Sequence, residues 1–497
     1  MKPGNLALAP TGCFPGAKVP IPAVPGALRD KERGMDVAFT YPLLIRRGFS
    51  FYPMHREGSG VDRIDVALLG LGTVGTGVYK MLQSNQDVIA RRTGLLFEVK
   101  HILVRDPNKK RKVDGVKNLL TTRFEEIMAT GVDVVMEAMG GVEPARTYIE
   151  RAIRSRCHVV TANKELIAKH GAELEKLAQE HGVQLLYEAS VGGGIPVLGT
   201  LQHFLKANRI LRVSGILNGT TNFILTQMGE HQRSFEEVLA EAQRLGYAEA
   251  DPTADVEGFD AAHKLTILSR LAFGAVVPVD EIARRGITDI SPAELELAHR
   301  LGYRIKLLAK AEQFGEEGPV ALQVGPTLVP LSHPLSGING VYNAIHIEAD
   351  TVQDVTLVGQ GAGEQPTASA MVEDLCNLFR LPLPRPLSYR RPLVLPVWEE
   401  GGARFAFIET KDRLGSDISQ QVKERLKRFG TSAVDVAWLP GAERSALALI
   451  LRRWDPSLQE KLTEELELEA ERVVFRPLLG TPEPVGAERE AKISSAQ

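Results

Sequence analysis

The sequence has few of the residues that build a disulfide scaffold or a membrane span. Its 497 residues include three cysteines, far apart and odd in number: Cys13, Cys157 and Cys376. Such thiols make neither a disulfide framework nor a zinc-finger cluster, and they suit a reducing compartment. No apolar run approaches the length that crosses a bilayer. Pro and Gly interrupt the N-terminal region too often for a secretory signal. We therefore expect a cytoplasmic protein.

The sequence also lacks an excess of charge of either sign. Its 59 Lys and Arg nearly balance 62 Asp and Glu, and the formal net charge is −3. No strong global field attracts nucleic acid or an anionic membrane, so we expect neither as a partner. The hydrophobic fraction of 44% is ordinary for a folded chain. The length corresponds to about three domains of roughly 150 residues each.

Residues 1–60 differ from the rest of the chain. They contain eight prolines and eight glycines, and the first periodic signal begins at residue 63. This composition disfavours a packed core, so we predict a disordered extension. Met54 lies just before the first expected strand, which leaves open whether residues 1–53 belong to the native protein.

Residues 61–192 alternate short apolar runs with amphipathic stretches. The apolar runs, expected as strands, are 64–69, 97–104, 132–138, 157–161 and 183–187. The amphipathic stretches, expected as helices, are 74–91, 123–130, 144–155 and 165–181. Buried strands separated by helices predict βαβ units on a parallel sheet, and hence an α/β fold with a Rossmann-type dinucleotide-binding domain.

A glycine-rich turn with the sequence GLGTVG directly follows the first expected strand. In this pattern the first glycine makes the tight turn, the second admits a pyrophosphate, and the third lets helix and strand pack closely. The start of the next helix supplies free N–H groups for the phosphates. We expect five residues here to bind the cofactor: Gly70, Gly72, Thr73, Val74 and Gly75.

The second expected strand ends in Arg105 and Asp106. An acidic residue at this place favours the ribose hydroxyl of NAD, whereas an arginine favours the 2′-phosphate of NADP. Because Arg105 comes first, the sequence favours NADP and leaves NAD open. Gly140 lies in a paired-glycine turn after the strand 132–138 and is a further candidate for contact with the cofactor.

Residues 193–365 read as an α+β open-sheet domain, which we expect to bind substrate, carry catalysis and form a dimer. Its expected helices are 234–245, 257–273 and 292–311. Its expected strands are 209–216, 319–329, 339–349 and 352–358. A further helix, 366–380, precedes an extended Pro- and Arg-rich link at 380–386.

Residues 403–478 have a separate pattern of expected strands and helices. The expected strands are 404–410, 432–438, 445–452 and 471–476, and the expected helices are 416–428 and 456–468. The order βαββαβ is ferredoxin-like. We expect the tail, 479–497, to be flexible.

Two lysines stand out as candidates for proton transfer. Lys164 follows a predicted strand at the sheet edge where open α/β sheets bind ligands. Lys264 lies four residues after Asp260, so that the ammonium and the carboxylate share one helix face. Such a pair alone is more often a surface ion pair than a catalytic site.

Several motifs taken together favour a catalytic role for these lysines. They occur in order as GLGTVG at 70–75, TANK at 161–164, EASVGGGIP at 188–196, NGTTN at 218–222, LGYAEADP at 245–252, DVEGFDAAHK at 255–264 and GQGAG at 359–363. The combination resembles homoserine dehydrogenase over roughly residues 62–380. The resemblance implies NAD(P)-linked interconversion of L-homoserine and L-aspartate 4-semialdehyde, in threonine and methionine biosynthesis. It also implies that helix 366–380 returns to the nucleotide domain.

The resemblance also implies roles for individual residues. Lys264 matches the usual proton donor and acceptor, Lys164 lies near both nicotinamide and substrate, and Asp260 helps to hold substrate and Lys264. Further cofactor contacts fall on Gly246 and Gly363. The substrate contacts fall on Glu249, which would bind the ammonium group, and on Asp260, Gly219, Thr220, Tyr247 and Asp255. A monovalent-cation site, for sodium, falls on Glu188, Val191, Gly193 and Ile195, with mostly backbone carbonyl ligands.

The C-terminal segment resembles an ACT regulatory domain, on the turn Asp412-Arg413-Leu414-Gly415 and the element order. ACT domains bind amino acids at dimer interfaces, so the resemblance implies threonine as effector and a homodimer or homotetramer. A dimerisation module without an effector stays open.

Two other functions stay open from the sequence. One is another small amino-acid or semialdehyde oxidoreductase on the same scaffold. Acylating chemistry would need an activated cysteine, and neither Cys157 nor Cys376 has an activating position. The other is a non-catalytic regulator that senses the dinucleotide.

Overall fold

The computed structural model describes residues 62–381, 389–395, 402–428, 431–441, 443–452, 456–480 and 482. The predictions for residues 1–60, for most of the link at 380–386 and for most of the tail lie outside these residues. The first tail residue, Leu479, is buried and its N–H donates to the Leu328 carbonyl. No helix in the described part is long and apolar enough to cross a membrane.

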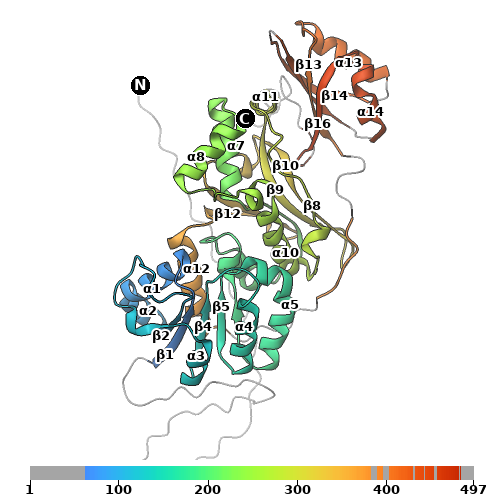
Figure 1. Ribbon diagram of the computed structural model, residues 1–497. Coiled ribbons are helices and arrows are strands. Elements are labelled where there is room, and N and C mark those ends of the chain that lie inside the picture. Colours follow the sequence, from blue (N-terminus) through green and yellow to red (C-terminus); the bar gives the residue numbers. More distant parts are fainter. Residues whose placement is uncertain are drawn as a thin grey trace, which may run out of the picture. The chain divides into compact units, whose positions relative to one another are not determined.

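The first part of the described chain forms a six-stranded parallel sheet in the order β3-β2-β1-β4-β5-β6 (Figure 1). Its strands are β1 (Asp62–Leu69), β2 (Leu95–Leu103), β3 (Leu120–Thr121), β4 (Val134–Glu137), β5 (His158–Thr161) and β6 (Leu185–Leu186). The strand order reverses between β1 and β4, which confirms the predicted Rossmann-type topology. Ligands bind such sheets beyond the carboxyl ends of the strands at this reversal.

The helices of this part cover both faces of the sheet. They are α1 (Thr73–Ser84), α2 (Gln86–Thr93), α3 (Phe124–Thr130), α4 (Ala145–Arg154) and α5 (Lys164–Glu180). The predicted single helix 74–91 is therefore wrong in one respect, because the chain breaks at Asn85 between α1 and α2.

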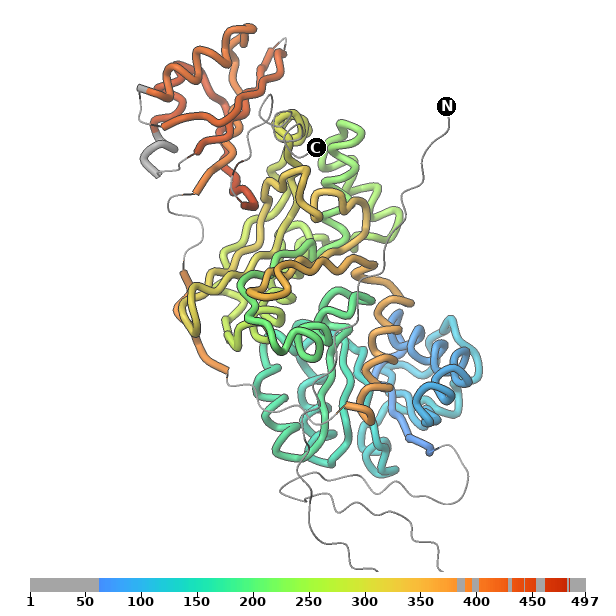
Figure 2. Tube along the Cα trace, turned by 180° about the vertical axis from the view of Figure 1, so that it is seen from behind, coloured from blue at the N-terminus to red at the C-terminus, as the bar shows by residue number. Residues whose placement is uncertain are grey.

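Helix α12 (Glu364–Asn377) packs against α1 although nearly 300 residues separate them (Figure 2). A Cβ atom at Gly77 would lie 2.7 Å from the Glu364 carbonyl oxygen, so only glycine permits this approach. Lys80 and Glu364 form an ion pair across the same contact, at 2.7 Å. The chain thus returns to the nucleotide-binding half, as the resemblance implies.

A second, mixed sheet has the order β12-β11-β7-β9-β10-β8. Its strands are β7 (Ile210–Ile216), β8 (Ala283–Arg284), β9 (Tyr303–Gln313), β10 (Val320–Pro330), β11 (Tyr342–Ala349) and β12 (Gln353–Gln360). The helices beside it are α7 (Gly219–His231), α8 (Phe235–Leu245), α9 (Thr253–Val256), α10 (Phe259–Phe273) and α11 (Pro292–Arg300).

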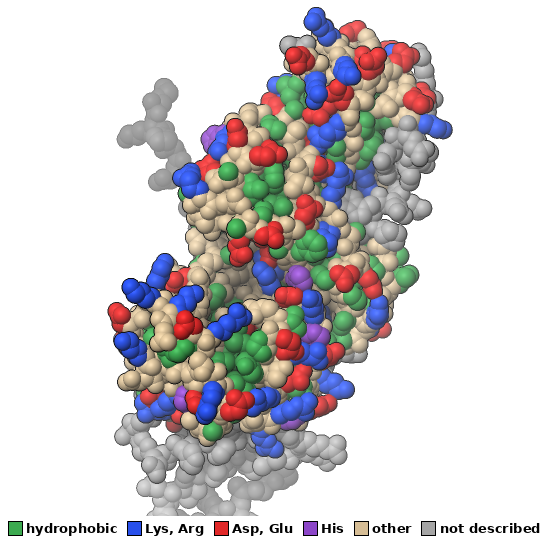
Figure 3. All heavy atoms as spheres, in the orientation of Figure 1, with side chains coloured by type: hydrophobic (Ala, Val, Ile, Leu, Met, Phe, Trp, Pro, Cys, Tyr) green, Lys and Arg blue, Asp and Glu red, His purple; other side chains and the backbone are tan. Residues whose placement is uncertain are grey.

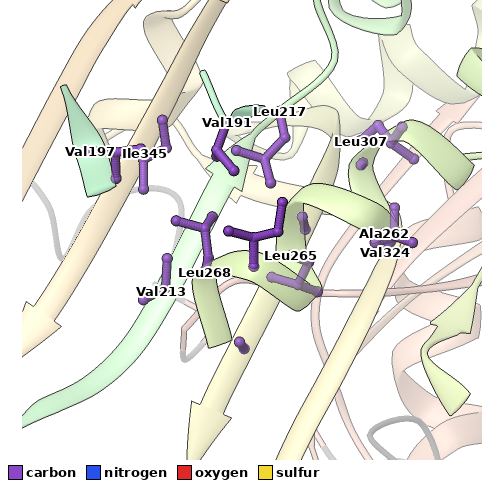
Figure 4. Packing of buried hydrophobic residues seen from close by; sticks show 14 of the residues in the cluster. Val191, Val197, Val213, Leu217, Ala262, Leu265, Leu268, Leu307, Val324 and Ile345 are labelled. Carbon is purple, nitrogen blue, oxygen red and sulfur yellow. The ribbon is translucent and has the colours of Figure 1, made fainter. Parts of the chain in front are cut away.

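Helix α10 lies on this sheet through its apolar side. Leu265 and Leu268 of α10 point toward Leu217 and Val213, and all four side chains are almost completely buried (Figure 4). Burying such side chains contributes on the order of 1.5–3 kcal/mol each. The packing fixes the rotation of α10 and therefore the direction in which its polar residues point.

The predicted helix 292–311 is wrong in its second half. Helix α11 ends at Arg300, Gly302 follows with a φ of +85°, and residues 303–313 form β9. Strand β9 pairs antiparallel with β10 along its whole length and also with β7. The apolar residues of this run, interrupted by Lys306 and Lys310, fit a helix or a strand, and the pairing with β10 and β7 decides for the strand. Helix α7 was absent from the prediction.

The C-terminal part confirms the predicted βαββαβ order. Its elements are β13 (Arg404–Thr410), α13 (Ile418–Arg428), β14 (Ala433–Leu439), β15 (Ser445–Leu451), α14 (Pro456–Glu465) and β16 (Ala470–Pro477). The four strands are antiparallel in the order β14-β15-β13-β16. On the face of the protein drawn in Figure 3, acidic and basic side chains are interspersed, in keeping with the balanced charge.

Candidate active site

Two residues of α10 form the buried centre of the site. Lys264 Nζ lies 2.7 Å from Asp260 Oδ2 and donates to the Leu217 carbonyl at 2.6 Å. Both side chains are at least nine-tenths buried. The i, i+4 spacing on α10 brings them together, and the apolar packing of the opposite side keeps them there. Burial this deep distinguishes them from the surface ion pair that the sequence alone favoured.

Lys164 reaches the same carboxylate from the other sheet. It is the first residue of α5, at the carboxyl end of β5, and its Nζ lies 2.5 Å from Asp260 Oδ1. Its side chain stays 46% exposed, in contrast to Lys264. One carboxylate therefore lies between two ammonium groups that come from the two halves of the protein.

This arrangement moves the pKa values of the three groups apart. Desolvation raises the pKa of Asp260, but the attraction of Lys264 and Lys164 outweighs it and the pKa is lowered. Desolvation lowers the pKa of Lys264 below the ordinary lysine range, and the charge of Lys164 adds to this effect. For Lys164 desolvation acts in the same direction, but the attraction of Asp260, Asp255 and Glu249 raises the pKa. The two lysines therefore hold their protons with different strengths.

Asn218 is a site residue that the sequence reasoning missed. Its Nδ2 donates to Asp260 Oδ2 at 2.9 Å and to Asp255 Oδ1 at 2.7 Å. Its Oδ1 caps α7 by accepting from the Thr221 N–H at 2.8 Å. Asn immediately before Gly-Thr-Thr is a helix N-cap signal, so recognising α7 in the sequence would have pointed to this residue.

The predicted substrate residues surround this centre. Gly219 begins α7, where a Cβ atom would lie 2.8 Å from the Val341 carbonyl oxygen. Thr220 Oγ1 donates to the Tyr247 carbonyl at 2.6 Å, and the Tyr247 ring packs on Phe223. Glu249 is exposed, yet its charge is close enough to act on Lys164.

Asp255 is the second carboxyl beside Asp260. Desolvation raises its pKa, and the negative charge of Asp260 raises it further. Residues 218–220, 247, 249, 255 and 260 thus place acidic and hydrogen-bonding groups around two lysines. These groups are chemically suited to a small molecule that carries a cationic amino group and a polar oxygen.

The glycines of the predicted nucleotide turn have the geometry that the turn requires. Gly70 has a φ of +99°, and a Cβ atom at Gly75 would lie 2.1 Å from the Gly70 carbonyl oxygen. Gly72 is the N-cap of α1, with open space where a Cβ would be, and Thr73 and Val74 begin the helix. The first turn of α1 contains no acidic residue. The backbone N–H groups at the start of α1 therefore suit a pyrophosphate.

A buried carboxylate organises the neighbouring turn. Glu137, at the end of β4, accepts from the Met139 N–H at 2.7 Å, the Gly140 N–H at 3.3 Å and Thr161 Oγ1 at 2.5 Å. Asn163 Nδ2 donates to the Gly141 carbonyl at 2.6 Å and ties the turn to the start of α5.

Gly140 in this turn has a φ of +74°, and no atom lies within 4 Å of the Cβ position there. Gly246 and Gly363 are the C-cap of α8 and the N-cap of α12, and both are exposed.

Comparison with known proteins gives the family. The family models "Homoserine dehydrogenase, NAD binding domain" and "Homoserine dehydrogenase" match residues 70–188 and 196–376. Homoserine dehydrogenase of Pseudomonas aeruginosa is 39% identical over 428 residues, which are 84% of this chain and 98% of that protein. The chain belongs to the homoserine dehydrogenase family. The protein of Bacillus subtilis is 47% identical over 318 residues, 64% of this chain and 73% of its own length.

Solved structures of the homoserine dehydrogenase family agree with the fold. The crystal structure of a homoserine dehydrogenase from Thiobacillus denitrificans has a TM-score of 0.73 and 36% identity, and covers 84% of this chain and 99% of its own. A hyperthermophilic archaeal homoserine dehydrogenase in complex with NADPH has a TM-score of 0.55 and 26% identity, and covers 65% of this chain and all of its own. This chain is therefore an NAD(P)-dependent oxidoreductase that acts on a CH–OH group.

Arg105 and Asp106, the predicted determinants of the choice between NADP and NAD, lie in an exposed turn after β2. Asp106 Oδ1 accepts from the Asn108 N–H at 2.8 Å, so this carboxylate shapes the turn. Arg111 closes the same turn through the carbonyls of Asp106 and Lys109, at 2.6 and 2.8 Å.

In the loop that the resemblance assigned to a cation site, Val191, Gly193 and Ile195 are buried and Glu188 is partly buried. Glu188 accepts from the Leu198 and Gly199 N–H groups at 2.8 and 2.6 Å, and burial raises its pKa to about 7. Gly193 has a φ of +55°. In the described part of the chain, no cluster of three His, Cys, Asp or Glu side chains could hold a metal ion. A cation here would therefore rest on backbone carbonyls.

The two described cysteines argue against an acylating semialdehyde dehydrogenase. Cys157 and Cys376 are buried, and desolvation raises the pKa of Cys157 to about 11 and that of Cys376 to about 12. Neither is a thiolate at neutral pH, so neither provides the nucleophile that acylating semialdehyde chemistry needs.

Proposed function

We propose that the chain catalyses the reversible oxidation of L-homoserine to L-aspartate 4-semialdehyde with NADP or NAD, within threonine and methionine biosynthesis. The observation that carries the proposal is the Asp260 carboxylate between Lys164 and Lys264, at the carboxyl ends of the parallel strands. This arrangement supplies a base, a fixed cation and nearby carboxylates in one place.

The two lysines divide the chemistry. In the oxidation direction, neutral Lys264 accepts the hydroxyl proton of homoserine, because burial lowers its pKa. Lys164 keeps its charge and stabilises the oxygen as negative charge develops on it. The bound nicotinamide supplies the hydride acceptor. In the reverse direction Lys264 returns the proton to the carbonyl oxygen.

The acidic residues recognise the amino acid. The exposed Glu249 carboxylate pairs with the substrate ammonium, while Asp260 holds both lysines and the substrate. Thr220, Tyr247 and Gly219 line the same side of the substrate site. The contact between α7 and the turn after α8 holds them there. The positive charge of the substrate ammonium suits these carboxylates.

NADP is the favoured cofactor in this proposal. Arg105 is exposed at the end of β2, and Asp106 is occupied by its own turn. A free guanidinium suits a 2′-phosphate, and the basic residues at positions 109–112 add positive charge nearby.

We extend the proposal to a sodium ion on the carbonyls of Glu188, Val191, Gly193 and Ile195. Hard oxygen ligands suit this ion, and the positive φ of Gly193 supports a loop that turns carbonyls inward. The Glu188 carboxylate stays with the N–H groups of Leu198 and Gly199.

Threonine inhibition through the C-terminal domain, in a homodimer or homotetramer, completes the proposal. The ferredoxin-like topology supports it. Asp412 of the resembling turn accepts from Thr410 Oγ1 and the Glu469 N–H, both at 2.7 Å, and so joins β13 to β16. Activity that is unchanged at millimolar threonine would favour a dimerisation module.

A spectrophotometric assay tests the function. Homoserine with NADP or with NAD at alkaline pH should produce reduced nicotinamide, faster with NADP. Folded protein that reduces neither cofactor would contradict the proposal.

A further inference from the structure

A second buried polar cluster joins the two helices that carry the lysines. We name it the Arg270 cluster: Arg270 of α10, Glu175 of α5, Tyr187 and Tyr389. The hydroxyls of Tyr187 and Tyr389 donate to the two oxygens of Glu175. Arg270 Nη2 donates to Glu175 Oε1 and to the Tyr187 hydroxyl, both at 3.2 Å.

The Arg270 guanidinium lies directly on the backbone of α5. Its Nη1 donates to the Ile167 carbonyl at 2.8 Å, and a Cβ atom at Gly171 would lie 2.2 Å from Nη1 and 2.5 Å from Nη2. The side chain is 2% exposed. The glycine at position 171 leaves the space that the guanidinium occupies between α5 and α10.

The positions along the two helices connect this contact to the active site. On α5, the Ile167 carbonyl is one turn from Lys164. On α10, Arg270 is less than two turns from Lys264. A helix is stiff over such lengths, so a shift of α5 on α10 at Gly171 changes the distance between Lys164 and Asp260.

Tyr389 ties a third segment to the cluster. The Arg390 N–H donates to the Gly274 carbonyl, and the Arg390 carbonyl accepts from the Val276 N–H, both at 2.9 Å. Residues 389–395 lead toward the C-terminal domain and are thus attached next to the end of α10.

We propose that the Arg270 cluster is a positioning device that sets Lys164 against Asp260, with Tyr389 connecting the segment before the C-terminal domain to it. The proposal rests on the function proposed above. A buried arginine that keeps all its partners holds two helices in one geometry, whereas a buried arginine that loses them is strongly unfavourable. Arg270, Glu175, Tyr187 and Tyr389 are positioning residues, since none touches the reacting atoms.

The sharpest test is Gly171→Ala, which adds one methyl group and leaves every member of the cluster in place. The added carbon overlaps the guanidinium, so either the end of the Arg270 side chain must leave its partners or α5 must move away from it. We expect kcat for homoserine oxidation to fall about tenfold or more, since misplacement by about 1 Å is costly in an active site. The affinity for NADPH, measured by fluorescence, should change by less than about twofold because the nucleotide turn is untouched.

Gly229→Ala is the matched control. Gly229 is also inside a helix, α7, and its nearest neighbour would be Leu295 at an ordinary 3.9 Å. The control should keep wild-type kcat. If Gly171→Ala also keeps the wild-type kcat, the positioning role is wrong.

A pH profile separates positioning from loss of stability. The charge of Lys164 helps to lower the pKa of Lys264, while Asp260 and Asp255 act in the opposite direction. When Lys164 withdraws, the ascending limb of kcat/KM, which reports deprotonation of Lys264, should move to higher pH in Gly171→Ala. A limb at the wild-type pH would overturn the proposal even if kcat fell.

Tyr389→Phe provides the test if Gly171→Ala does not fold, because it removes a single hydroxyl. We expect kcat to fall about threefold, together with the same shift of the limb. Tyr148→Phe is its control, because Tyr148 lies on α4, stacks on Phe124 and is not a member of the cluster. Wild-type kinetics in Tyr389→Phe would contradict a role for this residue.

A crystal structure of Gly171→Ala distinguishes failure of this inference from failure of the proposed function. The Lys164–Asp260 ion pair, 2.5 Å in the native chain, should open beyond 4 Å. An unchanged ion pair would refute the positioning role whatever reaction the protein catalyses. Wild-type protein that does not oxidise homoserine would refute the function instead.

Discussion

Lys164 and Lys264 share one carboxylate but lie in different surroundings. Lys264 is buried on α10 and bonded to a carbonyl, with a lowered pKa, whereas Lys164 is about half exposed at the start of α5, with a raised pKa. The difference shows that desolvation and charge can separate the pKa values of two identical groups that share one partner. In the proposed mechanism it makes Lys264 the proton carrier and Lys164 the permanent cation.

Loss of Lys264 should have the largest effect. Lys264→Met keeps the apolar stem but removes the base, so kcat should fall by about a thousandfold or more. The affinity for NADPH should be unchanged, as fluorescence titration would show. Lys169→Met, on the exposed side of α5, is the control and should keep full activity. A loss of less than tenfold in Lys264→Met would exclude this lysine as the base.

Loss of the shared carboxylate should come next. Asp260→Asn leaves two ammonium groups facing each other without their counter-charge, so kcat should fall about a hundredfold. Because Asp260 raises the pKa of Lys264, the ascending limb of the pH profile should move to lower pH in this variant. Stopped assays across pH 6–11 would measure both effects. Movement of the limb to higher pH would contradict the assignment.

Asn218→Ala should have a smaller effect of about tenfold on kcat, the expected value of a hydrogen bond to a charged group. The amide orients Asp260 and Asp255 without touching the reacting atoms. Asn85→Ala, at a helix end without a side-chain cap bond, serves as its control. Equal thermal stability with equal kcat in both variants would remove Asn218 from the site.

Glu249→Ala should have the smallest effect on turnover. The KM for homoserine should rise roughly fivefold to tenfold while kcat changes little, because the carboxylate binds the ammonium in ground state and transition state alike. Glu236→Ala on exposed α8 is the matched control. An unchanged KM would place the ammonium elsewhere.

The sequence predicted the nucleotide half more fully than the mixed sheet. Buried parallel strands and the glycine turn at 70–75 are local signals, and the structure agrees with them. Residues 303–311 were assigned to a helix because their pairing with β10 and β7 is not local. The same limitation hid Asn218, whose partners lie 37 and 42 residues away.

The residue types of the candidate site were predictable from the sequence, but the difference in burial between its two lysines was not. The spacing of Asp260 and Lys264 gave one shared helix face. Lys164 meets Asp260 only when the two sheets come together, 96 residues later in the chain. Burial, which separates the two lysines, is a property of the packed structure.

The pH dependence of kcat/KM for homoserine oxidation tests the division between the two lysines most directly. In the wild type, activity should rise through a pKa below the ordinary lysine range, since neutral Lys264 is required and burial lowers its pKa. In Lys164→Met the limb should move to higher pH, because the cation that helps to lower this pKa is gone. A limb that stays in place or moves to lower pH in Lys164→Met would contradict the division of roles.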